Sequence, residues 1–275
     1  MRQRAISAAV LVPVLLIVLA LGGAVLAVAI AIATGLAAIE VFRLLRTAGY
    51  APLSALGTAL ALAVVLDAAV PTALEGSGLL LGAVGIVLVA IAAFGRPDPH
   101  DGLATWIGTI FGALYVSLLA FVIRLGDAAP AVPAGSPLAA LGAERAWILL
   151  LLLSVWSYDT GAYLVGKRFG RAKFLTHISP SKTYAGLIGG VVATTVVVAI
   201  ALWAVGQSPW HAIALGPLIA LAAQAGDLAE SVIKRAAGEK DSGNLIPGHG
   251  GMLDRVDSFL FAAPVLTLYV VAVLA

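Results

Sequence analysis

The sequence has no cysteine among its 275 residues. This absence excludes a disulfide framework and any metal site built on thiolate ligands. Charged residues are also scarce, at 11% of the chain, whereas a soluble domain carries about 25%. Hydrophobic residues make up 61%. The composition therefore predicts an integral membrane protein.

Apolar runs of about 17–25 residues, the length that a membrane-spanning helix needs, recur along the whole chain. Clusters of glycine, proline or charged residues separate them. We expect an all-α, polytopic integral membrane protein with about nine transmembrane helices, at 5–21, 24–42, 54–70, 78–94, 104–124, 146–166, 184–205, 210–233 and 257–275. Only Gly22 and Gly23 divide the first two runs, so one bent helix is the alternative there.

The basic residues indicate the orientation, because cytoplasmic loops are enriched in lysine and arginine. With the N-terminus in the cytoplasm, only Arg124 and Arg145 of the sixteen basic residues fall outside, and the other fourteen fall inside. No internal repeat is visible, which disfavours a transporter. No polar segment is long enough for a soluble domain. Function is therefore expected in short loops and helix ends at the cytoplasmic face.

Two regions differ in their polar content. Residues 1–145 are expected to form an N-terminal transmembrane scaffold of about five helices. Within it, Glu40 beside Arg43 is explained by an interfacial ion pair, and the G-x-x-x-G pair of Gly108 and Gly112 is typical of close helix packing. Residues 146–275 are expected to form a C-terminal transmembrane catalytic region of about four helices, with cytoplasmic loops at 167–183 and 234–256.

The stretch from 226 to 257 is the most polar part of this catalytic region. It holds six of the chain's fourteen carboxylates: Asp227, Glu230, Glu239, Asp241, Asp254 and Asp257. On a helix, Asp227, Glu230 and Lys234 share one face, since they lie at i, i+3 and i+7. Carboxylates suit a hard divalent cation, and the lysines and arginines among them suit phosphate oxygens. The pattern indicates metal-assisted phosphate chemistry.

A solvated charged loop is the alternative explanation for these residues. However, Asp227 and Glu230 lie inside an apolar segment, where a carboxylate costs roughly 2–3 kcal/mol and needs a partner or a purpose. Asp159 also lies inside an apolar run, either as a hydrogen-bond acceptor between helices or as a ligand of ribose or metal. The loop 167–182 carries five basic residues, which set topology or attract phosphate. We expect a polar cavity walled by the last four helices.

The polar stretch resembles the signature of the phosphatidate cytidylyltransferase (CDP-diacylglycerol synthase) family, S-x-hydrophobic-K-R-x4-K-D followed by H-G-G-x-x-D-R-x-D. The matching residues are Ser231, Lys234, Arg235, Lys240, Asp241, Gly243, Ile246, Pro247, His249, Gly250, Gly251, Asp254, Arg255 and Asp257. Two earlier family segments are matched by Asp159, Gly161, Ala162, Tyr163, Gly166, Lys167, Phe169 and Gly170, and by Ser179, Pro180, Lys182, Thr183 and Gly186. Ser181 and Ala185 depart from the lysine and glutamate of the family. The resemblance covers residues 150–275.

The resemblance implies a nucleotidyltransferase of phospholipid biosynthesis, which makes CDP-diacylglycerol and pyrophosphate from CTP and phosphatidic acid. The implied cofactor is Mg²⁺ (or Mn²⁺), with a monovalent cation as a further candidate. We predict metal ligation by Asp227 and Asp254, supported by Glu230 and Asp257. The predicted catalytic residues are Asp227, Lys234, Lys240, Asp254 and Asp257. The predicted substrate-binding residues are Asp159, Lys167, Ser179, Lys182, Thr183, Ser231, Arg235, His249, Gly250, Gly251 and Arg255.

Two alternatives remain at this point: a related CTP-dependent polyprenol or lipid kinase, and a cation transporter that uses the buried carboxylates as a relay. The expected partners are CTP, phosphatidic acid and membrane lipids, with no nucleic acid, and a homodimer is left open. The expected location is the bacterial inner (plasma) membrane, with the active site facing the cytoplasm.

Overall fold

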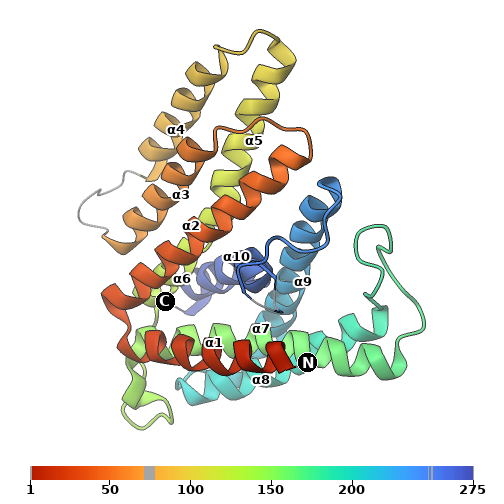
Figure 1. Ribbon diagram of the computed structural model, residues 1–275. Helices are drawn as coiled ribbons and strands as arrows, with labels where there is room; N and C mark the ends of the chain where they lie inside the picture. The colour runs from red at the N-terminus through yellow and green to blue at the C-terminus, as the bar shows by residue number, and fades with distance from the viewer. Residues whose placement is uncertain (1, 71–77, 247, 249, 275) are drawn as a thin grey trace. The chain divides into compact units, whose positions relative to one another are not determined.

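A computed structural model describes residues 2–70, 78–246, 248 and 250–274 (Figure 1). The regular elements over these residues are helices, and the extended pairings found among them are two isolated bridges, Lys173 with Thr183 and Ile246 with Gly250. The all-α fold predicted from the sequence is confirmed. Pro247 and His249 of the signature lie outside the described residues.

The chain forms two compact units, each continuous in space but not in sequence. The first comprises Met1–Ile123 and Val232–Val256, and the second comprises Arg124–Ser231 and Asp257–Ala275. The predicted division into scaffold and catalytic region concerns function, and it stays a prediction. Each unit is considered by itself below.

The first unit is built on five helices: α1 (Arg2–Leu21), α2 (Gly23–Thr47), α3 (Ser54–Ala69), α4 (Gly78–Ala93) and α5 (Pro99–Ser117). Helices α2, α3 and α5 pack on one another, and α4 packs against α3 and α5 (Figure 1).

Phe42 explains how closely the helices of this unit approach. Its ring is fully buried, and a Cβ added at Gly57 of α3 or at Gly112 of α5 would collide with it. The absence of side chains at these two positions therefore admits the ring between the helices. Gly112 thus supports close packing, as its G-x-x-x-G motif predicts.

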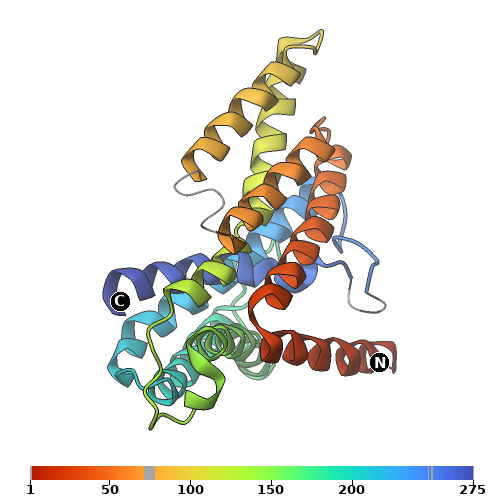
Figure 2. The ribbon, with the colours of Figure 1, turned by 90° about the vertical axis from the view of Figure 1, so that its left-hand side faces the viewer.

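The second unit contains α7 (Gly142–Phe169) and α8 (Tyr184–Ala204), which lie side by side (Figures 1 and 2). A Cβ at Gly161 would meet Ala193, and a Cβ at Gly189 would meet Val165, so glycine on each helix lets the other approach. Thr183 caps the N-terminus of α8, since its hydroxyl accepts a hydrogen bond from Gly186 N at 3.1 Å.

Three other helices complete the described chain: α6 (Ala120–Ala128), α9 (Ala212–Ala236) and α10 (Leu253–Tyr269), which continues as a π-helical turn over Val270–Leu274. Short 3-10 turns lie at Ala139–Leu141 and Pro209–His211. Each of these three helices contributes residues to both units, because a unit boundary falls inside each of them.

Within the described chain, six helical segments are long and apolar enough to cross a membrane, by length and composition. They are Gly23–Thr47, Pro99–Ala128, Ala139–Phe169, Tyr184–Ala204, Pro209–Ala236 and Leu253–Leu274. Three shorter apolar helices lie at Ala9–Leu21, Ser54–Ala69 and Gly82–Ala93. These nine helices fall on the nine predicted runs, but the shorter three do not reach the usual spanning length. The polytopic membrane fold is confirmed, and the count of nine spans stays a prediction.

Candidate functional site

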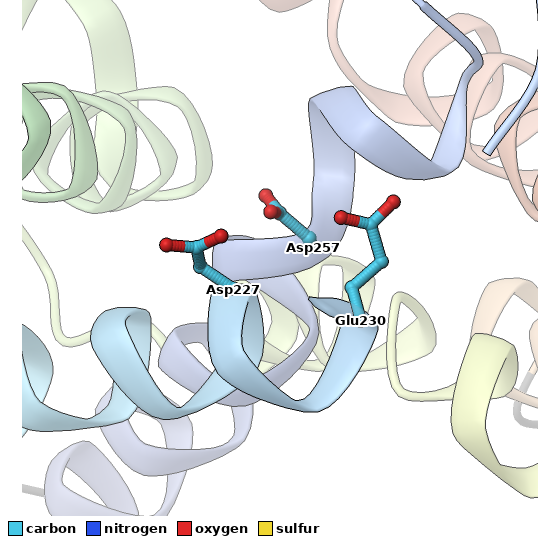
Figure 3. A group of neighbouring side chains, drawn as sticks. All are labelled: Asp227, Glu230 and Asp257. Carbon is cyan, nitrogen blue, oxygen red and sulfur yellow. The ribbon is translucent and has the colours of Figure 1, made fainter. Parts of the chain in front are cut away.

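Three carboxylates meet in the second unit. Asp227 and Glu230 lie on α9 and Asp257 lies on α10, and one oxygen of each is within 4.8 Å of the others. Figure 3 shows Asp227 and Glu230 one turn apart on α9, with Asp257 beside them on the neighbouring helix. Glu230 is fully buried, and the two aspartates are partly buried. A carboxylate cluster with little access to water needs positive charge to offset it.

Gly226 is what allows the two helices to meet here. A Cβ at this position would collide with the carbonyl oxygen of Asp257 and crowd Ser258. Because Gly226 has no side chain, α10 can approach α9 closely enough to bring Asp257 beside Asp227.

These three side chains fit a divalent metal ion in donor type. Mg²⁺ prefers carboxylate oxygens at about 2.1 Å, so two oxygens that share one ion are at most about 4.2 Å apart. The upper limit of 4.8 Å between the three donors is within a small side-chain rotation of that spacing. Of the predicted ligands, the structure therefore brings together Asp227, Glu230 and Asp257.

Lys182 lies directly against this cluster. Its Nζ forms an ion pair with Asp227 Oδ2, and each side chain is about a quarter exposed. Lys182 comes from the segment between α7 and α8, which the Thr183 cap ties to the start of α8. The site thus places the ammonium group of Lys182 next to the carboxylate of Asp227, although these residues are 45 positions apart in the sequence.

A cavity of about 320 Å³ adjoins Lys182 in the same unit. Four of the predicted substrate-binding residues line it: Asp159, Lys167, Lys182 and Thr183. Gly166 and Gly186 are also in its wall, which keeps the backbone of α7 and α8 accessible to a ligand. The cavity was expected to be walled by the last four helices. Its lining residues come from α7, the 170–183 segment, α8 and α9, and α10 is not represented among the described lining residues. The wall has two ammonium groups and one carboxylate, which suits a phosphate carried on a polar, hydroxyl-bearing group.

Gln224 is a cavity residue that sequence reasoning missed. It is 5% exposed, and its Oε1 accepts a 2.6 Å hydrogen bond from Tyr158 OH. Its Nε2 is buried and has no hydrogen-bond partner among the described residues. Buried donors are normally paired, so this amide N–H is available to a ligand bound in the cavity. Its signal in the sequence is a glutamine within an apolar run, three residues before Asp227.

Asp254 belongs to a separate network in the first unit. Its Oδ1 accepts from Lys234 Nζ at 2.7 Å, and its Oδ2 accepts from the backbone N–H of Ser242 at 2.9 Å and of Gly251 at 2.8 Å. The Ser242 hydroxyl lies 2.8 Å from the same oxygen. The side chains of Lys234 and Asp254 are only 10% and 8% exposed. The structure therefore pairs two predicted catalytic residues with each other.

The glycines of the H-G-G motif are explained by this network. Gly250 has a φ of 79°, a left-handed backbone conformation that favours glycine, and a Cβ there would collide with Asp254 Oδ2. A Cβ at Gly251 would collide with Ser242 Oγ and with the Glu40 carboxylate. Both glycines thus leave room for carboxylates, which supports a packing role; their predicted contacts with phosphate remain untested.

The remaining predicted residues are placed as follows. Asp227 and Asp254 lie in different units, so their joint metal ligation stays a prediction. Ser231 is buried on α9, and Ser179 is partly buried between α7 and α8. Three basic side chains are exposed: Arg235, which donates to Glu239 O at 2.8 Å, Lys240 and Arg255. His249 lies outside the described residues.

Comparison with known proteins identifies relatives along the whole chain. The sequence profile of the cytidylyltransferase family matches residues 2–273. A phosphatidate cytidylyltransferase of Synechocystis sp. is 34% identical over 287 residues, which cover 99% of this chain and 97% of the relative. Proteins of the same name from Staphylococcus aureus and Staphylococcus haemolyticus are 44% and 42% identical over 127 residues, or 46% of this chain and 49% of each relative.

Proposed function

Because the chain belongs to the cytidylyltransferase family, we propose that it transfers the cytidylyl group of CTP to phosphatidic acid. The products are CDP-diacylglycerol and pyrophosphate, and the reaction serves phospholipid biosynthesis. The single observation that carries the proposal on the structural side is the cluster of Asp227, Glu230 and Asp257 beside Lys182.

The reaction joins two anions. An oxygen of the lipid phosphate attacks the α-phosphorus of CTP, and the bond from that phosphorus to the oxygen bridging to the β-phosphate breaks. The bridging oxygen leaves with pyrophosphate and keeps the electron pair. The attacking oxygen is already ionised, so no side chain needs to remove a proton from it. The barrier is lowered by positioning and by neutralising negative charge.

The carboxylates of Asp227, Glu230 and Asp257 would hold Mg²⁺ in this proposal. The bound ion supplies positive charge to the phosphate oxygens during the transfer. Lys182, held by Asp227, keeps an ammonium group at the edge of the cavity, where it binds and orients a phosphate. Since Asp227 contacts Lys182 directly, the same carboxylate serves both functions.

The cavity is proposed to hold the polar part of the substrates. At about 320 Å³ it is near the lower end of the range for small-molecule sites. Lys167 and Lys182 bind phosphate there, Asp159 accepts a hydrogen bond from a hydroxyl, and Gln224 donates one from its amide. The acyl chains stay in the membrane, because withdrawing each CH₂ from it costs roughly 0.8 kcal/mol.

The reaction is tested by giving the purified protein, in lipid nanodiscs, CTP labelled with ³²P at the α-phosphate together with phosphatidic acid. We expect the label to move into CDP-diacylglycerol, with one pyrophosphate released for each lipid product. A CTP-dependent lipid kinase would instead leave the label in free CDP and phosphorylate a lipid alcohol. A cation transporter would leave CTP intact. Either of these results would contradict the proposal.

The proposed orientation places the active site at the cytoplasmic face of the bacterial inner membrane. The chain has no cysteine, so a single introduced thiol reports on one loop. We expect Arg171→Cys, between α7 and α8, to react with a membrane-impermeant thiol reagent only after the cells are permeabilised. Ala134→Cys, at an exposed position between Arg124 and Arg145, which are predicted to lie outside, is the matched control and should react in intact cells. The reverse pattern would show that the orientation is inverted.

A further inference from the structure

Glu40 makes contacts that span most of the length of the chain. It lies on α2 and is 7% exposed. Its Oε1 accepts a hydrogen bond from Met252 N at 2.9 Å, and its Oε2 accepts one from Leu253 N at 2.8 Å. These two N–H groups stand at the start of α10, where a helix has no partners of its own for its first donors. A carboxylate at this end of a helix is also favoured by the helix dipole.

Ser242 connects Glu40 to the Lys234–Asp254 pair. Its hydroxyl lies 2.9 Å from Glu40 Oε2 and 2.8 Å from Asp254 Oδ2. A hydroxyl has one proton, so Ser242 donates to one carboxylate at a time and holds both within hydrogen-bond reach. The side chains of Glu40, Ser242, Asp254 and Lys234 therefore form one continuous network inside the first unit.

The backbone around Glu40 is shaped to admit its carboxylate. A Cβ at Gly251 would collide with both of its oxygens, and a Cβ at Gly243 would collide with Oε1. Glycine at these two positions is thus needed for Glu40 to reach the start of α10. This requirement is independent of the hydrogen bonds, and it points to the same residue.

Helix α2 is a rigid support for this contact. Phe42, two residues after Glu40, is locked between Gly57 and Gly112. Arg43, three residues after Glu40, donates to Ser242 O at 2.7 Å and so makes a second contact with the same segment. The described residues between α9 and α10 form turns and bends, so they depend on such contacts for a fixed position.

We propose that Glu40 is a positioning residue for the segment 234–256, which we term the signature segment. Its carboxylate fixes the start of α10 and, through Ser242, the geometry of Asp254 and Lys234. The catalytic part of this inference rests on the proposed cytidylyltransferase activity; the structural part does not. Residues 1–145 then contribute more than a scaffold, because one of their side chains sets the position of the signature.

The test uses Glu40→Gln and Glu40→Ala in the full-length protein, with Glu239→Gln as the matched control. Glu239 belongs to the signature segment and also contacts α2, through an ion pair with Arg43. This pair is 3.7 Å long and half-exposed, so it contributes little. In Glu40→Gln an amide N–H₂ faces a backbone N–H, so one of the two α10 contacts is lost. We expect faster hydrogen exchange at Met252 and Leu253. We expect kcat to fall about 10–100-fold with little change in KM for CTP, the cost of a misplaced site.

Several results would overturn the inference. The first is rapid exchange of Met252 and Leu253 in the unaltered protein, a measurement that needs no variant to fold. Another is a Glu40→Gln protein with normal exchange at these amides, or one whose kcat is within twofold of the unaltered protein. A loss of activity matched by an equal loss of folded protein would assign Glu40 to stability alone. If the unaltered protein makes no CDP-diacylglycerol, the proposed activity fails, while the exchange data still test the contact.

Discussion

Asp227→Asn is expected to lower the rate of CDP-diacylglycerol formation by about 10³-fold while the protein still folds and inserts. Removing one negative charge weakens the proposed metal site of Asp227, Glu230 and Asp257, and metal-derived charge stabilisation amounts to several kcal/mol. The same change removes the charge that pairs with Lys182. Asparagine keeps the size of the side chain, so packing on α9 is preserved. The measurements are kcat at saturating CTP and the affinity for Mn²⁺ by electron paramagnetic resonance.

Asp67→Asn serves as the control for this prediction. Asp67 is also a carboxylate on an apolar helix, α3, but it lies outside the cluster. Its substitution should leave both kcat and Mn²⁺ affinity within about twofold of the unaltered protein, as expected for a carboxylate that is not among the proposed ligands. If Asp227→Asn retained its Mn²⁺ affinity, Asp227 would be removed from the metal site, whatever its effect on turnover.

The helices were largely predictable, because each is marked by a long apolar run with a glycine, proline or charged break. What the runs did not specify is where a helix ends. Helix α9 continues to Ala236, past the end of the predicted run at 233, and Lys234 in this extension is paired with Asp254. The runs at 54–70 and 78–94 predicted two spans, but α3 and α4 have only 16 residues each and fall short of the usual spanning length.

The candidate site was predictable where spacing along one helix decides the geometry. Asp227 and Glu230 share a face of α9 as their spacing requires. That Asp257 joins these two carboxylates depends on how α10 packs against α9, and Gly226 permits that packing through its close contact with Asp257. For Glu40 the predicted ion pair with Arg43 is wrong, because Glu40 accepts hydrogen bonds from Met252 and Leu253 while Arg43 pairs with Glu239. Its role could not be read from the sequence, since Met252 lies 212 residues away. No local pattern carries information about a contact at that separation.

Lys234→Met is expected to destabilise the protein by about 3–5 kcal/mol, the usual cost of leaving one charge of a buried pair alone. Asp254 would retain its backbone hydrogen bonds from Ser242 and Gly251 but would lose its contact with the ammonium group of Lys234, whose Nζ lies 2.7 Å from Oδ1. The side chains are 10% and 8% exposed, so water offers little compensation. The measurement is the midpoint of thermal unfolding in detergent, compared with Arg235→Met, whose exposed side chain should matter little.

The double variant Lys234→Met, Asp254→Asn separates stability from catalysis. Asparagine removes the unpaired charge, and its side-chain oxygen still accepts from Gly251 N–H, so much of the lost stability should return. If Lys234 and Asp254 act only by stabilising the fold, turnover should return with it. If they contribute to the reaction, as their place in the signature predicts, the double variant should be stable and still inactive. A Lys234→Met protein as stable as the unaltered one would show instead that the pair is solvated and that its burial does not carry the energy assigned to it.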